Sequence, residues 1–488
     1  MSETTTTGTT SGTLAAGKLR TWDIVFFVMS AAAPLTVVVS AAPTTLRLGG
    51  IGAAGAMLAC GIVLILFATG FTAMSRYVRN AGAFYAYAAR GLGRPAGIGT
   101  AFVTIFAYVV LSISFYGFIG FFGQLTASSV FGIDVSWVVW SLLAAALVGL
   151  LGYRKIDVGA KVLAVLLTAE VAILVVLAVA VLVQGGPEPL SAAPFDPANV
   201  FFAPGAAALF VVGFGAFLGF EGTAIYAEEA KDPERTVPNA TYIAVAFLAA
   251  FYAFMFWVVT VAFGVDGALA LAASDDFEGM MFIAGESYLG AWAGIVMQIL
   301  IVTSFFACVL AFHNASSRYL FALGREGLLP RRLARTHAKT NAPHVASLAM
   351  SVIAIVAILV AFALGADPFL QLAIWTYATG VAGLIFAQGV AAVSVVGFFA
   401  RDRRGHGAWR VIVAPALGGL GLILGWVLIA SNFEIVTTMT GPVNALLLLP
   451  VPVLFVAGIV VALRIRSTRP DEYARLASEG EAALDSPG

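Results

Sequence analysis

The sequence predicts an all-α membrane protein with about twelve transmembrane helices, and three observations support this fold class. Of the 488 residues, 61% are hydrophobic and only 11% are charged. The mean hydropathy of +0.98 lies well above that of water-soluble domains. A helix needs about 20 mostly apolar residues to cross the hydrocarbon core of a bilayer, so a chain of this length has room for roughly a dozen crossings.

Polar segments are expected at both ends of the chain. Residues 1–17 are rich in Thr, Ser and Gly without periodicity, and they predict a disordered tail. Residues 466–488 are polar and charged and predict a second, solvated tail on the cytoplasmic side. Between the two tails, residues 18–465 are expected to form one membrane domain.

Apolar runs bounded by charges or turn residues place the individual spans. The first six are residues 22–46, 51–74, 98–124, 135–153, 158–184 and 204–226. The second six are residues 239–263, 291–323, 345–364, 368–400, 411–431 and 443–463. An even number of spans puts both ends of the chain on the same side of the membrane.

The distribution of positive charge agrees with this count. All 26 Lys and Arg residues except Arg47 fall in the tails, in the alternate gaps that would lie on one side, or near the span ends that border those gaps. Because positively charged loops resist translocation, this side is expected to face the cytoplasm. The sequence therefore predicts a multi-pass protein of the cell (inner or plasma) membrane with both termini in the cytoplasm.

Two spans carry sequences that are expected to interrupt a helix. Residues 30–36 read Ser-Ala-Ala-Ala-Pro-Leu-Thr, and residues 213–222 read Gly-Phe-Gly-Ala-Phe-Leu-Gly-Phe-Glu-Gly. An irregular backbone at membrane depth persists only where it lines a cavity or binds something. Breaks five spans apart are typical of inverted-repeat transporters. The alternative interpretation is that Pro34 only kinks its helix and the glycines only allow close packing.

Two carboxyl groups fall within spans, where ionisable residues are expensive and mark functional candidates. Glu221 lies in the second break, and Glu170 lies near the middle of the fifth span. Burial favours the neutral form of a carboxyl group, as a proton-carrying residue requires, so both are candidates for ion coupling. The alternatives are a structural role for Glu221 in the break and a water-facing Glu170.

Other polar and aromatic residues within the spans have less specific interpretations. His313 and Asn314 are interpreted as a satisfied polar pair between helices rather than as ligands. Five aromatic residues of the spans are expected either to gate a pathway or simply to pack helices. They are Tyr108, Tyr116, Trp257, Trp375 and Tyr377.

The segment that leaves the sixth span is rich in charge. Residues 228–240 read Glu-Glu-Ala-Lys-Asp-Pro-Glu-Arg-Thr-Val-Pro-Asn-Ala, in which Pro233 is expected to end one helix and Pro238 to begin the next. Acids at a helix C-terminus oppose the helix dipole, so Glu228 and Glu229 are expected to have basic partners. The residues expected to form a cytoplasmic gate are Glu228, Glu229, Lys231, Arg235 and Arg318.

Three further segments carry a family resemblance. Residues 76–87 read Arg-Tyr-Val-Arg-Asn-Ala-Gly-Ala-Phe-Tyr-Ala-Tyr, residues 314–330 read Asn-Ala-Ser-Ser-Arg-Tyr-Leu-Phe-Ala-Leu-Gly-Arg-Glu-Gly-Leu-Leu-Pro, and residues 341–343 read Asn-Ala-Pro. Together with residues 228–240 and with Phe-Leu-Gly-Phe-Glu at residues 217–221, they closely resemble the amino acid-polyamine-organocation (APC) permease superfamily over nearly the whole chain.

The resemblance implies a five-plus-five inverted repeat, with repeats at about residues 22–184 and 204–400, followed by two extra helices at about residues 411–463. It also implies a substrate site between the two broken helices, with the substrate carboxylate at the first break. The residues expected there are Ala31, Ala32, Ala33, Pro34, Leu35, Thr36, Phe217, Leu218, Gly219, Phe220 and Glu221. Many relatives have a Gly-Ser-Gly-like stretch at the first break, whereas this chain has bulkier residues.

These observations predict a secondary active transporter that moves an amino acid or a related amine by alternating access, with proton-coupled symport as the hypothesis for its energy source. An exchanger of amino acids or polyamines is the alternative, and a channel or a major-facilitator-type carrier is less favoured. Sodium coupling also stays open. The scattered cysteines and histidines and the lack of a Gly-rich phosphate loop predict no enzyme activity, cofactor, metal site or nucleic-acid partner.

Overall fold

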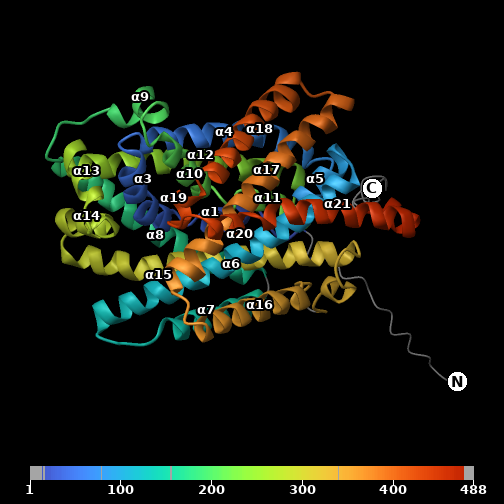
Figure 1. Ribbon diagram of the computed structural model, residues 1–488, viewed down its shortest axis with the longest axis horizontal. Coiled ribbons are helices and arrows are strands. Elements are labelled where there is room, and N and C mark those ends of the chain that lie inside the picture. Colours follow the sequence, from blue (N-terminus) through green and yellow to red (C-terminus); the bar gives the residue numbers. More distant parts are fainter. Residues whose placement is uncertain (1–13, 15–16, 79, 154–155, 339, 477–488) are drawn as a thin grey trace.

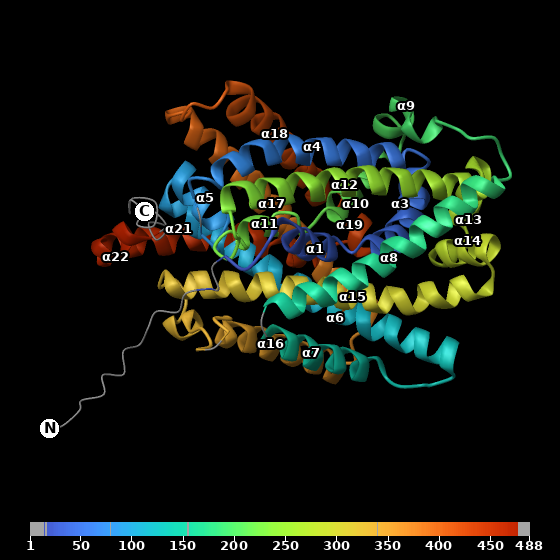
Figure 2. The ribbon, with the colours of Figure 1, turned by 180° about the vertical axis from the view of Figure 1, so that it is seen from behind.

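The computed structural model describes residues 14, 17–78, 80–153, 156–338 and 340–476. Long helices run side by side along one direction, and short helices lie at both ends of the bundle (Figure 1). At one end lie α5 (Phe84–Gly91) and α22 (Pro470–Arg475), and at the other end lie α9 (Pro197–Phe201), α13 (Val265–Ala273) and α14 (Met280–Leu289) (Figure 2). The last turn of α5 holds Arg90 and the last turn of α22 holds Arg475. We call this end of the bundle the basic face.

Ten helical segments among the described residues are long and apolar enough to cross a membrane. They are Thr21–Gly49, Ala53–Met74, Arg94–Phe131, Ala160–Gln184, Pro233–Phe263, Ala291–Arg325, His344–Ala363, Pro368–Arg401, Trp409–Ser431 and Pro442–Thr468. Two shorter apolar helices, Trp137–Gly152 and Ala206–Ala216, fall in the fourth and sixth expected spans. The prediction of an all-helical membrane fold is therefore confirmed, and each expected span coincides with an apolar helical segment.

The predicted tails fall largely outside the described residues. Of residues 1–17, the structure describes only residues 14 and 17, and it does not describe residues 477–488. In the described part of the second tail, α21 (Pro450–Thr468) extends past the end of the expected span and is followed by α22.

The first span is interrupted near Pro34, as predicted. Helix α1 (Thr21–Ala32) ends at Ala33, whose φ of 43° lies in the left-handed region. A residue that precedes proline is disfavoured in the right-handed helical region, which stops α1 at this point. The chain continues as α2 (Pro34–Thr36), the π-helical η1 (Val37–Ala41) and α3 (Ala42–Gly49).

The sixth span is also interrupted. Helix α10 (Ala206–Ala216) is followed by the irregular residues 217–221 and by the short α11 (Gly222–Ile225). Gly219 has a φ of 107°, and a Cβ atom at this position would lie 2.5 Å from the Cβ of Ala31. Glycine is therefore required at residue 219, both by its backbone conformation and because the two breaks touch there.

Helix α1 lies inside the bundle. It packs against α8 (Ile156–Gln184), α12 (Pro233–Phe263) and α15 (Ala291–Arg325), while α6 (Arg94–Phe131) packs against α15. The remaining elements are α4 (Ala53–Met74), α7 (Trp137–Tyr153), η2 (Ala193–Phe195), η3 (Phe277–Gly279), η4 (Arg331–Ala334), α16 (His344–Ala363), η5 (Pro368–Ile374), α17 (Trp375–Arg401), η6 (Trp409–Val413), α18 (Ala414–Ser431), α19 (Phe433–Thr437) and α20 (Pro442–Leu448). The first break therefore lies inside the bundle.

The prediction for the start of the seventh span was wrong. Helix α12 begins at Pro233, directly after its N-cap Asp232, and Pro238 lies inside the helix. Pro233 occupies the first helical position, where the missing N–H group needs no partner. Pro238 has no backbone N–H group to donate within the helix, so this turn of α12 forms one helical hydrogen bond fewer.

We predict that Gly418→Ala separates α18 from α4. A Cβ atom at residue 418 would lie 2.4 Å from the backbone nitrogen of Phe67, so the two helix backbones must move apart. Such overpacking costs about 1–3 kcal/mol, and the apparent melting temperature of the purified protein in detergent should fall. In the matched control Gly389→Ala, the new Cβ would meet Ile423 at an ordinary 3.5 Å. Equal melting temperatures of the two variants would contradict this close helix contact.

Candidate functional site

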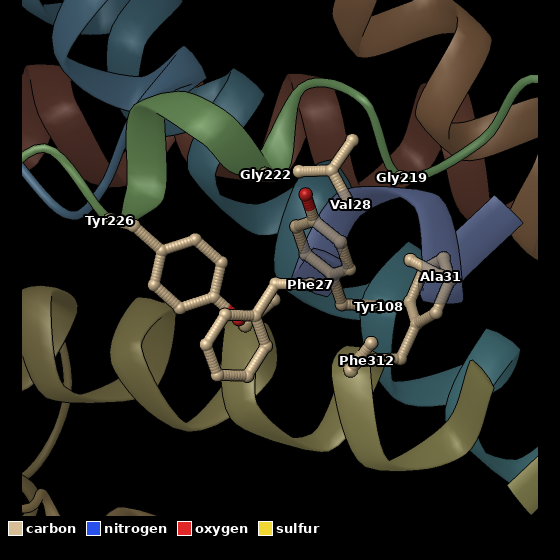
Figure 3. A pocket seen from close by; sticks show the side chains of 10 residues that line it. Phe27, Val28, Ala31, Tyr108, Gly219, Gly222, Tyr226 and Phe312 are labelled. Atoms are coloured by element: carbon tan, nitrogen blue, oxygen red, sulfur yellow. The ribbon is translucent and has the colours of Figure 1, made fainter. Parts of the chain in front are cut away.

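A small cavity lies between the two broken spans (Figure 3). Its walls come from α1, α6, α11 and α15, together with the irregular segment that holds Gly219 and with the residue after α11. The lining residues are Phe27, Val28, Ala31, Tyr108, Gly219, Gly222, Tyr226, Ala311, Phe312 and Ala315. The cavity is therefore bounded by aromatic rings, small residues and one branched aliphatic side chain.

Among the residues expected at the substrate site, Ala31 and Gly219 line this cavity. The others lie in the same two spans outside its wall, and all of them are buried except the half-buried Thr36. These residues are Ala32, Ala33, Pro34, Leu35, Thr36, Phe217, Leu218, Phe220 and Glu221. Of the aromatic residues singled out in the sequence, Tyr108 lines the cavity. Phe27, Tyr226 and Phe312 were not expected there, because no local pattern distinguishes them from other aromatic residues of the spans.

Glu221 is 1% exposed and accepts hydrogen bonds from three directions. The backbone N–H of Gly219 donates to Oε2 at 3.0 Å, and the Gln388 amide donates to the same atom at 3.3 Å. The Tyr108 hydroxyl donates to Oε1 at 3.2 Å. The carboxyl group therefore satisfies the backbone within the break, and Tyr108 connects it to the cavity wall. The structural interpretation and the coupling interpretation are compatible with each other.

The side chain of Glu170, on α8, lies against the start of the second half of the first span. It accepts a hydrogen bond from the Ser304 hydroxyl at 2.8 Å and another from the backbone of Leu35. Thr36 in turn donates to the Ser304 oxygen at 2.9 Å. Leu35 belongs to the first turn of α2, where backbone N–H groups have no partner within the helix. The place expected for the substrate carboxylate at the first break is thus next to a carboxyl group of the protein itself.

Side chains from three other helices donate hydrogen bonds to carbonyl groups at the breaks. The Cys308 thiol donates to Ala31 O at 3.0 Å, and the Tyr252 hydroxyl donates to Ala32 O at 3.0 Å. In the sixth span, the Tyr377 hydroxyl donates to Gly215 O at 3.1 Å. The breaks are therefore stabilised by α12, α15 and α17.

Towards the basic face, the cavity is closed by aromatic rings and a buried ion pair. The rings of Phe27 and Tyr226 stack with their centroids 4.8 Å apart, and the guanidinium carbon of Arg318 lies 5.0 Å from the Tyr226 centroid. Arg318 binds Glu229 through two nitrogens, and the two side chains are only 4% and 2% exposed. The ion pair thus lies directly behind one wall of the cavity.

A second ion pair lies one step closer to solvent. Arg325 binds both carboxylate oxygens of Glu228, at 2.7 and 3.0 Å, and the backbone N–H of Ala81 also donates to Glu228 at 2.8 Å. Glu228 and Glu229 therefore both have basic partners from α15, as expected from the helix dipole. The structure does not bring Lys231 and Arg235 into this cluster: Arg235 lies 3.8 Å from Asp232 on the surface, and the Lys231 side chain is exposed.

The chain that precedes α1 is tied to the same region. The backbone N–H groups of Lys18 and Leu19 donate to Glu229 O at 2.9 and 3.0 Å, and that of Lys231 donates to Leu19 O at 2.8 Å. Leu14 is buried in a small apolar cluster that includes Phe321. A β-bridge between Leu19 and Ala230 therefore holds the segment before α1 against the segment after α11. The two ion pairs hold the segment after α11 to α15.

His313 and Asn314 are both hydrogen-bonded, His313 to another helix and Asn314 within its own helix. His313 shares a hydrogen bond of 2.8 Å with Ser347 of α16, whereas the Asn314 amide donates to Leu310 O within its own helix. Consecutive residues of a helix do not face each other, which separates the two side chains.

The sequence model of the amino acid permease family matches residues 23–473. The branched-chain amino acid permease BcaP of Bacillus subtilis (strain 168) is 27% identical over 154 residues, which cover 32% of this chain and 31% of that permease. An uncharacterized transporter of Mycobacterium tuberculosis (strain ATCC 25618 / H37Rv) is 35% identical over 150 residues, covering 31% and 32%. The low-affinity putrescine importer PlaP of Escherichia coli (strain K12) is 25% identical over 144 residues, covering 29% and 30%. The aligned segments thus span about a third of each relative.

We predict that Arg318→Gln lowers the stability of the folded protein strongly, because it leaves the Glu229 carboxylate buried without a counter-charge. Breaking one side of a buried ion pair costs about 3–5 kcal/mol. The measurement is the apparent melting temperature in detergent. The double variant with Glu229→Gln removes the lone charge and should recover much of the loss.

Arg325→Gln is the matched control on the same helix. The side chains of the Arg325–Glu228 pair are 18% and 17% exposed, so solvent screens the charge that is left behind. If Arg325→Gln lowered the melting temperature as much as Arg318→Gln, the deeper burial of the Arg318–Glu229 pair would not explain the loss of stability.

Proposed function

Because this chain belongs to the amino acid permease family of the APC superfamily, we propose that it carries an amino acid or a related amine across the cell membrane by alternating access. The observation that supports this most directly is the cavity between the two broken spans. The family and the ten apolar helices make the chain a multi-pass membrane protein. In the proposed orientation the basic face and both termini lie in the cytoplasm.

The closed route to the basic face fits a carrier cycle. The Phe27–Tyr226 stack and the Arg318–Glu229 pair separate the cavity from this face, so release of a substrate in that direction requires both to open. Because Arg318 contacts the Tyr226 ring, the two layers of closure are expected to open together. A carrier needs such a closed state, whereas a channel conducts through a continuous pore.

Proton symport is the proposed coupling mechanism, and Glu221 is the first candidate for the proton carrier. Its hydrogen-bond partners Tyr108, Gly219 and Gln388 are all neutral, so a proton can bind without displacing a basic residue. Tyr108 lines the cavity, and a substrate that contacts this ring can alter the hydrogen bond to Glu221. Glu170 is the second candidate.

Exchange of amino acids or polyamines is the alternative mode of transport, since the same cavity would serve symport and exchange.

Purified protein in proteoliposomes tests the proposal. We expect saturable uptake of a radiolabelled amino acid that is concentrative under an imposed pH gradient, acidic outside, and that collapses when a protonophore is added. Concentrative uptake under a sodium gradient alone would contradict proton coupling. Uptake that requires internal substrate under every gradient would identify an exchanger, and flux that does not saturate would indicate a channel.

We predict that Glu221→Gln abolishes pH-driven accumulation but leaves exchange of internal for external substrate. The amide oxygen can still accept from Gly219 and Gln388, and the amide nitrogen can donate to the Tyr108 oxygen, so stability should change by only about 1 kcal/mol. The measurement compares pH-driven uptake with counterflow in the same vesicles. Glu170→Gln is the matched control, and loss of accumulation in that variant alone would assign the proton to Glu170 and a purely structural role to Glu221.

A further inference from the structure

Resting on the proposed transport function, we infer that the substrate is a neutral amino acid with a small apolar side chain, and that Gly222 sets the upper limit on the size of that side chain. The inference is drawn from the composition of the cavity wall and from the free space in front of Gly222 (Figure 3).

The cavity wall offers hydrogen-bonding groups for one polar end of a substrate. The Tyr226 hydroxyl is fully buried and has no hydrogen-bond partner among the described residues. The Ala31 carbonyl accepts one hydrogen bond from Cys308, and a carbonyl oxygen has a second lone pair, which can accept from an ammonium group. An α-amino acid carries an ammonium donor and a carboxylate acceptor on the same carbon. The Ala31 carbonyl matches the ammonium group, and the Tyr226 hydroxyl matches the carboxylate.

A second positive charge has no partner in this cavity. None of the lining residues carries a charge, and both nearby carboxyl groups are already hydrogen-bonded: Glu221 to Gly219, Gln388 and Tyr108, and Glu170 to Ser304. An ammonium group buried without a partner costs several kcal/mol. Cationic amino acids and diamines are therefore expected to be poor substrates, because no charged lining residue balances their second ammonium group.

The aromatic rings do not form an open cage for a cation. Tyr226 stacks on Phe27 and also contacts Arg318. Phe312 packs against Phe115 with the ring centroids 5.2 Å apart and against Tyr108 at 5.7 Å. Cation recognition by aromatic residues requires free ring faces, and the Phe27–Tyr226 stack already covers one face of each of its two rings.

Gly222 is the position at which the size of the cavity is set. A Cβ atom at residue 222 would meet only Val28, at 3.9 Å, so a side chain there projects into free space. Gly219, the other glycine of the wall, cannot be substituted in this way, because it has a positive φ and touches Ala31. Any side chain at residue 222 therefore takes up volume that a substrate side chain would use.

Competition for uptake in proteoliposomes tests the inference, with glycine, alanine, valine, leucine, phenylalanine, lysine, putrescine and choline as probes. We expect alanine and valine to compete, and lysine, putrescine and choline not to compete at a large excess. Gly222→Ala should weaken the largest accepted substrate by about tenfold or more while leaving alanine or glycine nearly unchanged, since one methylene in an apolar pocket changes selectivity by about 10–200-fold.

Two further variants make the result specific. Gly389→Ala is the matched control, because its new Cβ would meet Ile423 at 3.5 Å, outside the cavity lining, and it should keep the selectivity of the unmodified protein. If Gly222→Ala fails to fold, Ala315→Gly tests the same wall in the opposite direction and should admit a larger side chain.

The outcomes separate this inference from the function on which it rests. Saturable uptake of some substrate with equal competition by lysine, putrescine or choline overturns the neutral substrate class while transport stands. A selectivity of Gly222→Ala that matches Gly389→Ala overturns the role of Gly222. If none of the probes is taken up, and none raises the melting temperature of the purified protein, the proposed function itself fails.

Discussion

Every backbone group that a helix break sets free inside the bundle must find a hydrogen-bond partner within the protein, because lipid supplies none. At the first break this requirement is met from two neighbouring helices: Cys308 of α15 donates to Ala31 O, and Tyr252 of α12 donates to Ala32 O. Each partner fixes the position of its own helix against the break. The irregular backbone is thus a point where three helices are joined, and the packing around the cavity depends on it.

The two buried carboxyl groups meet the same requirement by accepting hydrogen bonds from backbone N–H groups at the breaks. Glu170 binds the backbone of Leu35 at the start of α2, and Glu221 binds the N–H of Gly219. A carboxyl group within a span is expensive, and a break with free N–H groups is one of the few places that compensates for it. If the proposed proton coupling holds, stabilising the break and binding the proton fall to the same atoms. Protonation at either site would weaken acceptance from the backbone and so act directly on the conformation of the break.

The sequence predicted those features that depend on local chemistry. Apolar length and alternating charge placed the spans, and Pro34 and the glycines around Glu221 placed the breaks. The composition of the cavity wall was not predictable in this way. Its aromatic side comes from residues as far apart in the chain as Phe27, Tyr226 and Phe312, and a helix that is apolar all round gives no indication of which side faces inward. Hydrophobic periodicity is informative when one face meets water, and these helices are surrounded by other helices and lipid.

The contact between Tyr226 and Arg318 links the cavity to the basic face. The Tyr226 ring forms part of the cavity wall, stacks on Phe27 of α1 and lies against the guanidinium group that binds Glu229. Glu229 in turn accepts, through its backbone carbonyl, the two N–H groups of the segment that leads into α1. A substrate that moves the Tyr226 ring would therefore disturb the stack, the ion pair and the start of α1 together. Both breaks contribute to the cavity and both lead to this cluster, so in the proposed transport cycle a movement of α1 relative to α11 would open the cavity towards the basic face.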